Sequence, residues 1–157
     1  MATTNLSDYD KNELAKADKL RFGLVVSNWN ADITENLYEG AKATLLDCGA
    51  LDVNIDRLDV PGSFELIFGA KQLLEKNRYD AVIAIGCVIQ GATKHFDFVC
   101  DAVSQGIKDL NIHYSAPTIF CVLTDNNKEQ SIERSGGRLG NKGVECAVAA
   151  IKMATLS

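Results

Sequence analysis

The sequence has little of what membrane proteins, metal centres and disulfide-stapled proteins need. Its longest apolar run, Ala81 to Ile89, is far shorter than the roughly 20 residues of a membrane-spanning helix. The five cysteines form no CxxC pair and only two histidines are present, which disfavours a zinc site or a disulfide framework. We therefore expect buried, free thiols in a reducing cytoplasm. The net charge of −5 disfavours nucleic acid and anionic membranes as partners.

The composition is that of one globular domain. The chain has 157 residues, of which 46% are hydrophobic and 24% charged. The first residues are acidic and carry no apolar core, so we expect residues 1–18 to form a loosely attached N-terminal arm. Residues 19–157 are then a single α/β domain, without a linker or an internal repeat.

Apolar and amphipathic segments alternate along the domain. The apolar segments predict β-strands at residues 20–27, 51–60, 81–89 and 117–123. Helical spacing predicts helices near residues 34–49, 66–74, 96–110, 128–135 and 144–151. The third and fourth apolar segments are nearly continuous, which is typical of parallel strands covered on both faces. The pattern predicts a three-layer α/β sandwich of flavodoxin-like type, with a four-stranded parallel sheet between helices.

Chemically versatile side chains follow the predicted strands. Ligands of open α/β sheets bind beyond the carboxyl ends of the strands, where these loops lie. The loops bring Trp29, Phe64, Glu65 and His95 to one edge of the sheet, together with the turn at residues 91–93. No nucleotide-binding glycine motif, G-x-G-x-x-G or G-x-x-x-x-G-K-[ST], is present.

Each of these residues also has a purely structural interpretation. The turn at residues 91–93 precedes a helix, so it is either an anion site or a plain turn capped by Thr93. His95 is either a proton-transfer group or a surface histidine. Trp29 either stacks on a flat heterocycle or packs as a lid, and Glu65 either binds a ligand or complements a helix dipole.

Two cations lie near three glycines before the last predicted helix. Arg134 and Lys142 flank Gly136, Gly137 and Gly140. Such a pair suggests a clamp for phosphate or carboxylate. The alternative is a solvated turn, but a cation at a helix start is slightly unfavourable, which favours the functional interpretation of Lys142.

Read in order, these segments resemble the lumazine synthase family from about residue 20 to about residue 156. The matching segments are VPGSFE at 60–65, YDAVI at 79–83, GCVI at 86–89, GATKHFD at 91–97, VLT at 122–124, EQ at 129–130, ERSG at 133–136 and GNKG at 140–143. Each is weak alone, and their common order makes the resemblance specific.

The resemblance implies an activity. Family members condense 5-amino-6-(D-ribitylamino)uracil with 3,4-dihydroxy-2-butanone 4-phosphate, which gives 6,7-dimethyl-8-ribityllumazine, phosphate and water in the penultimate step of riboflavin biosynthesis. The two small-molecule substrates already carry an amine nucleophile and a ketone. The resemblance therefore implies no metal and no organic cofactor.

The resemblance also implies roles for individual residues. His95 is the catalytic proton-transfer residue. The phosphate is bound by Ala92, Thr93 and Arg134. The pyrimidine and ribityl groups are bound by Trp29, Ser63, Phe64, Glu65, Cys87, Val88, Ile89, Phe120 and Lys142, with Phe120 supplied across a subunit boundary. Three positions depart from the usual pattern: Trp29 stands where Phe is more common, Ala92 where an acidic residue is, and Gln90 where Arg is.

The family assembles into homo-oligomers. Its pentamers in some members close into an icosahedral shell of 60 subunits, with riboflavin synthase as a further partner. Because the stretch from Arg134 to Asn141 carries no insertion, we expect the shell here. Two other functions stay open from the residues alone: a flavodoxin-like flavin-binding or redox module, and a shell protein without catalysis.

Overall fold

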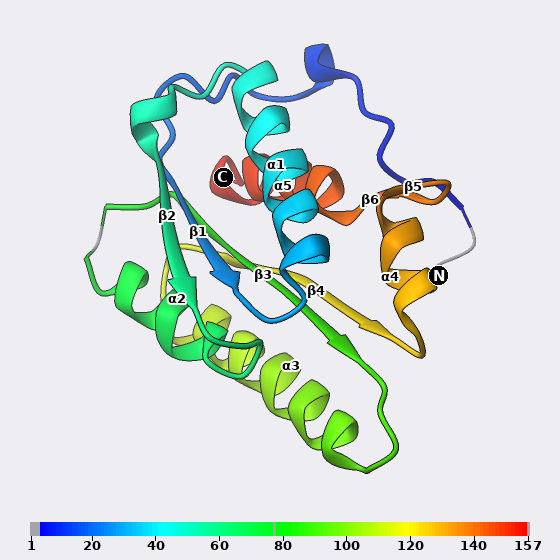
Figure 1. Cartoon of the computed structure of the whole chain (residues 1–157). Coiled ribbons are helices and arrows are strands. Elements are labelled where there is room, and N and C mark those ends of the chain that lie inside the picture. Colours follow the sequence, from blue (N-terminus) through cyan, green and yellow to red (C-terminus); the bar gives the residue numbers. More distant parts are fainter. Residues whose placement is uncertain (1–3, 77, 157) are drawn as a thin grey trace.

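A computed structural model describes residues 4–76 and 78–156. Four parallel strands form the central sheet in the order β2-β1-β3-β4 (Figure 1). Their bounds are Phe22–Ser27 for β1, Ile55–Val60 for β2, Ala81–Ile89 for β3 and Thr118–Asp125 for β4. The helices are α1 (Ala31–Asp47), α2 (Leu66–Leu74), α3 (His95–His113), α4 (Lys128–Arg134) and α5 (Lys142–Ala154). A short hairpin of β5 (Ser135–Gly137) and β6 (Gly140–Asn141) joins α4 to α5.

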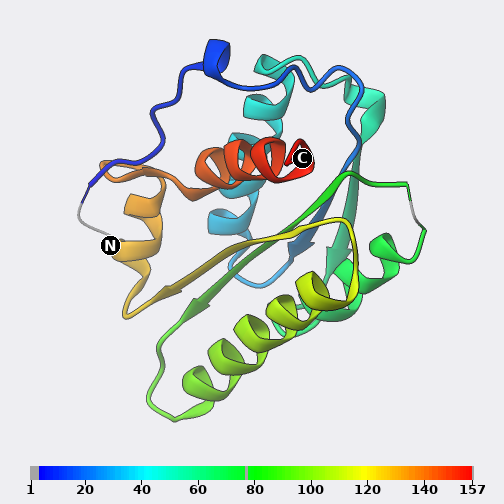
Figure 2. The same cartoon turned by 180° about the vertical axis from the view of Figure 1, so that it is seen from behind.

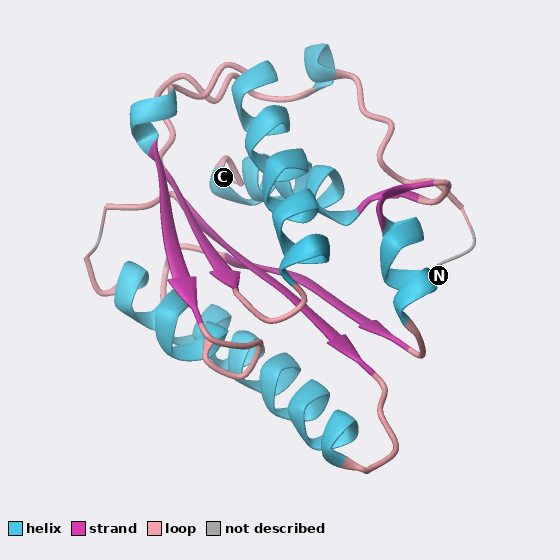
Figure 3. Ribbon diagram, viewed as in Figure 1, coloured by secondary structure: helices cyan, strands magenta, loops and turns pink. Residues whose placement is uncertain are grey.

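The helices cover both faces of the sheet. Helices α1 and α5 lie on one face and α2 and α3 on the other, as the views from the front and from behind agree (Figures 1 and 2). Figure 3 shows the same arrangement as a magenta sheet between two layers of cyan helices. The predicted three-layer α/β sandwich with a four-stranded parallel sheet is therefore confirmed.

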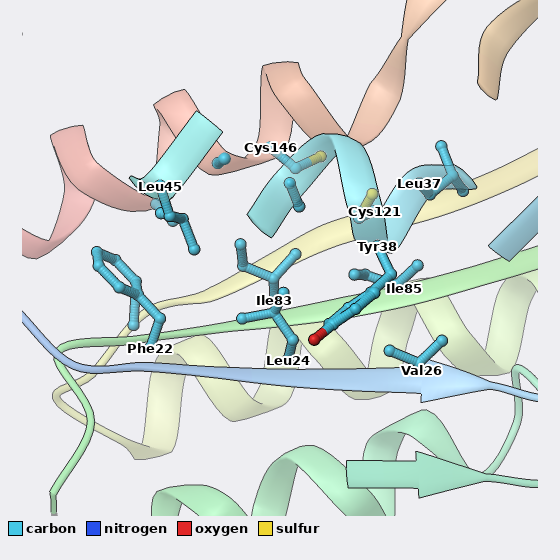
Figure 4. Close-up of a cluster of buried hydrophobic side chains, with 14 of the residues drawn as sticks. Phe22, Leu24, Val26, Leu37, Tyr38, Leu45, Ile83, Ile85, Cys121 and Cys146 are labelled. Atoms are coloured by element: carbon cyan, nitrogen blue, oxygen red, sulfur yellow. The ribbon is translucent and has the colours of Figure 1, made fainter. Parts of the chain in front are cut away.

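The two-residue period of the strands builds two separate cores. Phe22, Leu24 and Val26 of β1 point toward α1 and α5, where they meet alternate residues of β3 such as Ile83 (Figure 4). Val25, between them, points to the other face and packs with residues of α2 and α3. Both faces of β1 are buried along its whole length, which explains its nearly continuous apolar sequence.

The layer of α1 and α5 is packed very closely at one point. In α1, Leu37, Ala41 and Leu45 are fully buried, as their spacing predicts. Gly143, in the first turn of α5, lies directly against the backbone of Leu37, and a methyl group there would overlap the Leu37 carbonyl oxygen. Asn141 caps α5 by accepting a hydrogen bond from the Gly143 N–H at 2.8 Å.

Two sequence predictions need correction, and one element was missed. Residues 51–54 are not part of a strand: Asp52–Asn54 form a 3-10 turn, and Val53 is 77% exposed. The reason is that β1 begins at Phe22, whose partner is Ile55, so earlier residues have no strand to pair with. Strand β4 extends to Asp125 because β3 continues to Ile89 beside it. The hairpin of β5 and β6 was not predicted.

The described part of the N-terminal segment, residues 4–18, contacts the α1 side of the domain (Figure 1). The Asn141 N–H donates to Ser7 Oγ at 2.6 Å, and the Tyr9 hydroxyl donates to Asp47 Oδ2 at 3.0 Å. Ala17 is fully buried against the core. Among the described residues, no helix is both long and apolar enough to cross a membrane.

Candidate active site

At the carboxyl ends of the neighbouring strands β1 and β3, the chain turns to opposite faces of the sheet. After β1 the chain enters α1 on one face of the sheet, and after β3 it enters α3 on the other. Neighbouring loops that leave in opposite directions open a crevice, which is where α/β sheets bind ligands.

A cavity of about 270 Å³ occupies this crevice. Its walls come from the loop after β1, the loop after β2, the end of β3 and the first turns of α3. The lining residues are Trp29, Ser63, Phe64, Glu65, Cys87, Val88, His95 and Val99. The structure thus brings together most of the predicted site residues, although they are spread over 71 positions of sequence from Trp29 to Val99.

Hydrogen bonds to the Cys87 carbonyl organise the floor of the cavity. The Asn30 side-chain amide donates to this oxygen at 3.0 Å, and the Ser63 hydroxyl donates to it at 3.5 Å. Asn30 adopts a left-handed backbone conformation with φ of 59°, which asparagine tolerates better than most residues. The loops after β1 and β2 are thereby tied to the end of β3.

The Cys87 thiol is buried, hydrogen-bonded and unreactive. It donates to Ser131 Oγ at 3.4 Å, and Ser131 donates to Asp125 Oδ2 at 2.7 Å. Burial, the largest cause, raises the pKa of Cys87 to about 11. A thiol held neutral near pH 7 is a poor nucleophile, so Cys87 serves as part of the wall.

The same burial predicts a loss of stability at high pH. Below the ordinary thiol pKa of 9.0, Cys87 is protonated in both the folded and unfolded states, so it causes no pH dependence. Between pH 9 and about pH 11 only the unfolded state releases the proton, so the free energy of unfolding falls as pH rises. At about 1.4 kcal/mol per pKa unit, this shift of about two units corresponds to a loss of roughly 3 kcal/mol once the pH exceeds both values.

Chemical denaturation at pH 8 and pH 11 measures this effect. Other groups also titrate in that range, so the comparison is between the wild type and Cys87→Ala. The variant is expected to lose less stability than the wild type over this interval. Parallel stability curves for the two proteins would contradict the assignment.

The rim of the cavity is aromatic and open. Trp29 is 66% exposed and Phe64 is 54% exposed, so flat apolar surfaces face the opening. Glu65 lies just before α2, and its Oε2 atom is buried without a hydrogen-bond partner among the described residues. An unpaired buried carboxylate oxygen is costly unless a donor such as a ligand hydroxyl satisfies it. His95 is exposed beside these groups.

The predicted anion turn lies next to the cavity. Ala92 and Thr93 are exposed in the loop before α3, and Thr93 Oγ1 accepts a hydrogen bond from the His95 N–H at 3.4 Å. The N-cap residue Lys94 makes no capping bond through its side chain. The backbone N–H groups at the start of this 19-residue helix favour an anion there. Ile89 ends β3 half-buried, just outside the cavity lining.

A second polar cluster stands at the junction of α4 and α5. Glu145 accepts a hydrogen bond from Lys142 at 2.8 Å and lies 3.5 Å from Arg134 Nη2. The Arg134 side chain is only 8% exposed, and its Nη1 atom is buried without a partner in the described part of the chain. The positive-φ glycines Gly136 and Gly140 shape the hairpin between the two cations.

The cavity of one chain does not include this cluster. Neither Arg134 nor Lys142 lines it, and Arg134 instead borders a separate hollow with residues 124–127, 129 and 130. Phe120 also lies apart, 36% exposed on the edge strand β4, where its carbonyl accepts a hydrogen bond from Cys146 Sγ at 3.6 Å. The predicted site residues thus fall into two groups on one protomer.

Comparison with known proteins identifies the family. A model of the 6,7-dimethyl-8-ribityllumazine synthase family matches residues 19–157. The chain belongs to the lumazine synthase family. Among its relatives named 6,7-dimethyl-8-ribityllumazine synthase, the protein of Flavobacterium johnsoniae is 64% identical over 98% of this chain and 82% of its own length. The protein of Flavobacterium psychrophilum is 61% identical over 99% and 82%, and that of Christiangramia forsetii 59% over 99% and 95%.

Sequence reasoning missed two residues of these candidate site regions in this member of the lumazine synthase family. Glu145 was overlooked although it lies three residues after Lys142, a spacing that places both on one helix face. Asn30 was passed over as part of a loop, and its bond to the Cys87 carbonyl joins residues 57 positions apart, which no local pattern reveals.

Proposed function

We propose that this chain condenses 5-amino-6-(D-ribitylamino)uracil with 3,4-dihydroxy-2-butanone 4-phosphate to give 6,7-dimethyl-8-ribityllumazine, phosphate and water. The observation that carries the proposal is one cavity at the topological switch point of a lumazine synthase-family chain. It combines aromatic surfaces of Trp29 and Phe64, the imidazole of His95 and a buried carboxylate oxygen of Glu65 that has no hydrogen-bond partner within the described chain.

The cavity suits the pyrimidine substrate. The Trp29 indole offers a face for stacking on the uracil ring. Phe64 adds a second apolar surface against the bound pyrimidine. Glu65 Oε2 accepts from a ribityl hydroxyl and so gains its missing partner. The backbone of Cys87, Val88 and Ile89 at the end of β3 binds the polar edge of the uracil, with Ser63 beside it.

Imine formation, phosphate elimination and ring closure each move a proton. His95, exposed beside the cavity, is the group that transfers it. Both substrates bring their own reactive groups, so holding them together supplies most of the acceleration. Well-oriented groups gain about 7–11 kcal/mol in favourable cases, whereas a general acid or base adds typically about 10²–10⁴-fold.

Replacing His95 therefore slows the reaction without ending it. We expect His95→Ala to lower kcat by about 10²-fold and to retain measurable turnover. Steady-state kinetics with both substrates measures the change, and circular dichroism confirms that the variant folds. Complete loss of turnover in a folded variant would show that proton transfer, rather than substrate alignment, dominates the rate.

The phosphate group needs cations that the cavity of one protomer lacks. We assign the phosphate to the backbone at Ala92 and Thr93 and to Arg134 of a neighbouring copy, whose buried Nη1 is free to donate. Phe120 and Lys142 of that neighbour complete the pyrimidine end of the site. A head-to-tail contact of this kind generates a closed ring when the rotation between neighbouring copies closes on itself.

The assembly we propose is a pentamer that closes further into a shell of sixty copies. Sedimentation of the purified protein tests it, with an expected mass near sixty times 17.0 kDa. A mass near five times 17.0 kDa would support the pentamer and reject the shell. A monomer that is fully active would reject the shared site itself.

The activity is tested directly with the purified protein and both substrates. We expect the absorbance of the lumazine to appear together with released phosphate. A yellow protein that retains flavin and forms no lumazine would instead indicate a flavin-binding module. Assembly without turnover would indicate a shell protein. Riboflavin synthase, which consumes the product, is the proposed partner, and five free thiols among the described residues fit a cytoplasmic location.

A further inference from the structure

We propose that Gly62 is a positioning residue that sets the place of the Trp29 ring, and with it the affinity for the pyrimidine substrate. The inference rests on the proposed function, because it takes Trp29 as the surface on which the pyrimidine stacks. It concerns a residue that lines no part of the cavity and carries no side chain of its own.

The backbone of Trp29 is fixed from two sides. The hydrogen bonds between β1 and β2 continue beyond the strands, since the Asn28 N–H donates to the Val60 carbonyl at 2.8 Å and the Trp29 N–H donates to the Pro61 carbonyl at 3.0 Å. On the other side, Asn30 is bound to the Cys87 carbonyl. The remaining freedom at this position is therefore that of the indole ring.

Gly62 limits that freedom by direct contact. A methyl group at Gly62 would lie 2.6 Å from Trp29 Cε3 and 2.9 Å from Trp29 Cζ3, closer than real Cβ atoms come to other atoms. The six-membered half of the indole thus rests on the α-carbon of Gly62. The positive-φ glycines of the described chain are Gly49, Gly136 and Gly140, so at Gly62 the requirement is space and not conformation.

The same missing methyl also bears on the ribityl end of the site. It would lie 3.1 Å from Glu65 Oε2, the unpaired carboxylate oxygen of the cavity. Gly62 therefore holds the stacking ring and the hydroxyl acceptor at a fixed separation. A side chain here would push the ring toward a cavity of only about 270 Å³ and displace the carboxylate. The butanone phosphate is bound by other groups and should be unaffected.

The position of the ring can be measured without substrate, because Trp29 is the only tryptophan of the chain. We expect Gly62→Ala to change the emission maximum and the quenching of Trp29 by iodide. The matched control is Gly69→Ala, whose methyl would lie 2.7 Å from Val25 Cγ1 and 2.9 Å from Val60 Cγ1, away from the ring. The control is equally crowded, so it should lower the stability and leave the Trp29 signal unchanged.

Kinetics then connects the ring to the substrate. We expect Gly62→Ala to raise the Michaelis constant for the pyrimidine about tenfold, because stacking between a base and an aromatic ring is partly lost. The Michaelis constant for the butanone phosphate should stay unchanged. In a Trp29→Phe background the smaller ring can turn away from the methyl. The same Gly62→Ala change should then raise the pyrimidine constant by no more than about twofold, which is the coupling expected of residues in contact.

Three outcomes would overturn the inference. The first is an unchanged Trp29 signal in folded Gly62→Ala protein, and the second is a changed signal with an unchanged pyrimidine constant. The third is an equal effect of Gly62→Ala in the Trp29→Phe background. Failure of the proposed function can be distinguished from failure of this inference. In that case the wild type itself forms no lumazine, whereas the fluorescence comparison still reports whether Gly62 determines the position of the Trp29 ring.

Discussion

Arg134→Ala is expected to raise the Michaelis constant for 3,4-dihydroxy-2-butanone 4-phosphate by about 10²-fold, with a much smaller effect on the constant for the pyrimidine. Truncating one partner of a buried, hydrogen-bonded charge pair costs about 2–5 kcal/mol, and each 1.4 kcal/mol is about tenfold in affinity. The Arg134 side chain is 8% exposed, and its Nη1 has no partner among residues 4–76 and 78–156, so a phosphate bound there is shielded from water.

Two further variants make the Arg134 result specific. Arg134→Lys keeps the positive charge and loses the two-pronged geometry of the guanidinium, so an intermediate effect is expected. Arg138→Ala removes an arginine four positions away whose side chain is 77% exposed, and both Michaelis constants should stay at the wild-type values. Equal increases for both substrates in Arg134→Ala would point to a collapsed site instead of a lost phosphate ligand.

Gly143→Ala is expected to destabilise the fold by about 3 kcal/mol or more. The added methyl would overlap the Leu37 carbonyl oxygen, which belongs to a helix backbone and cannot turn aside as a side chain does. It would also lie 2.9 Å from Asn141 Oδ1, the atom that caps α5. Helices α1 and α5 must therefore separate, and part of the cap is lost with them.

Urea denaturation of the wild type and Gly143→Ala measures this cost. The matched control is Gly91→Ala, because a methyl at Gly91 has no atom within 4 Å. That control should change stability by no more than about 0.5–1 kcal/mol. A Gly143→Ala protein as stable as the wild type would mean that the two helices are not held as closely as described.

The fold was accessible from the sequence largely because the two central strands, β1 and β3, are buried on both faces. The run at 81–89 and the spacing of Leu37, Ala41 and Leu45 each identify one element without knowledge of the rest. Residues 51–54 were wrongly predicted as strand because Leu51 and Val53 alternate with polar residues as in a strand. Whether they can pair depends on where β1 begins, and its first paired residue, Phe22, lies opposite Ile55. The hairpin of β5 and β6 has too few residues for any period to be recognised.

The site was only partly accessible. Trp29, Phe64, Glu65 and His95 follow predicted strands, so topology alone places them at one edge of the sheet. The roles of the Gly62 surface and of Asn30 depend on contacts between separate loops, which appear only after the chain is folded.

The division of these groups between two places on the protomer has a consequence for counting. If each active site needs the cavity of one copy and Arg134 of the next, the number of active sites equals the number of subunit interfaces and not the number of subunits. A closed ring then has as many centres as members, whereas an open fragment of the same ring always has one fewer. Closure of the assembly is thus itself a contribution to catalytic capacity.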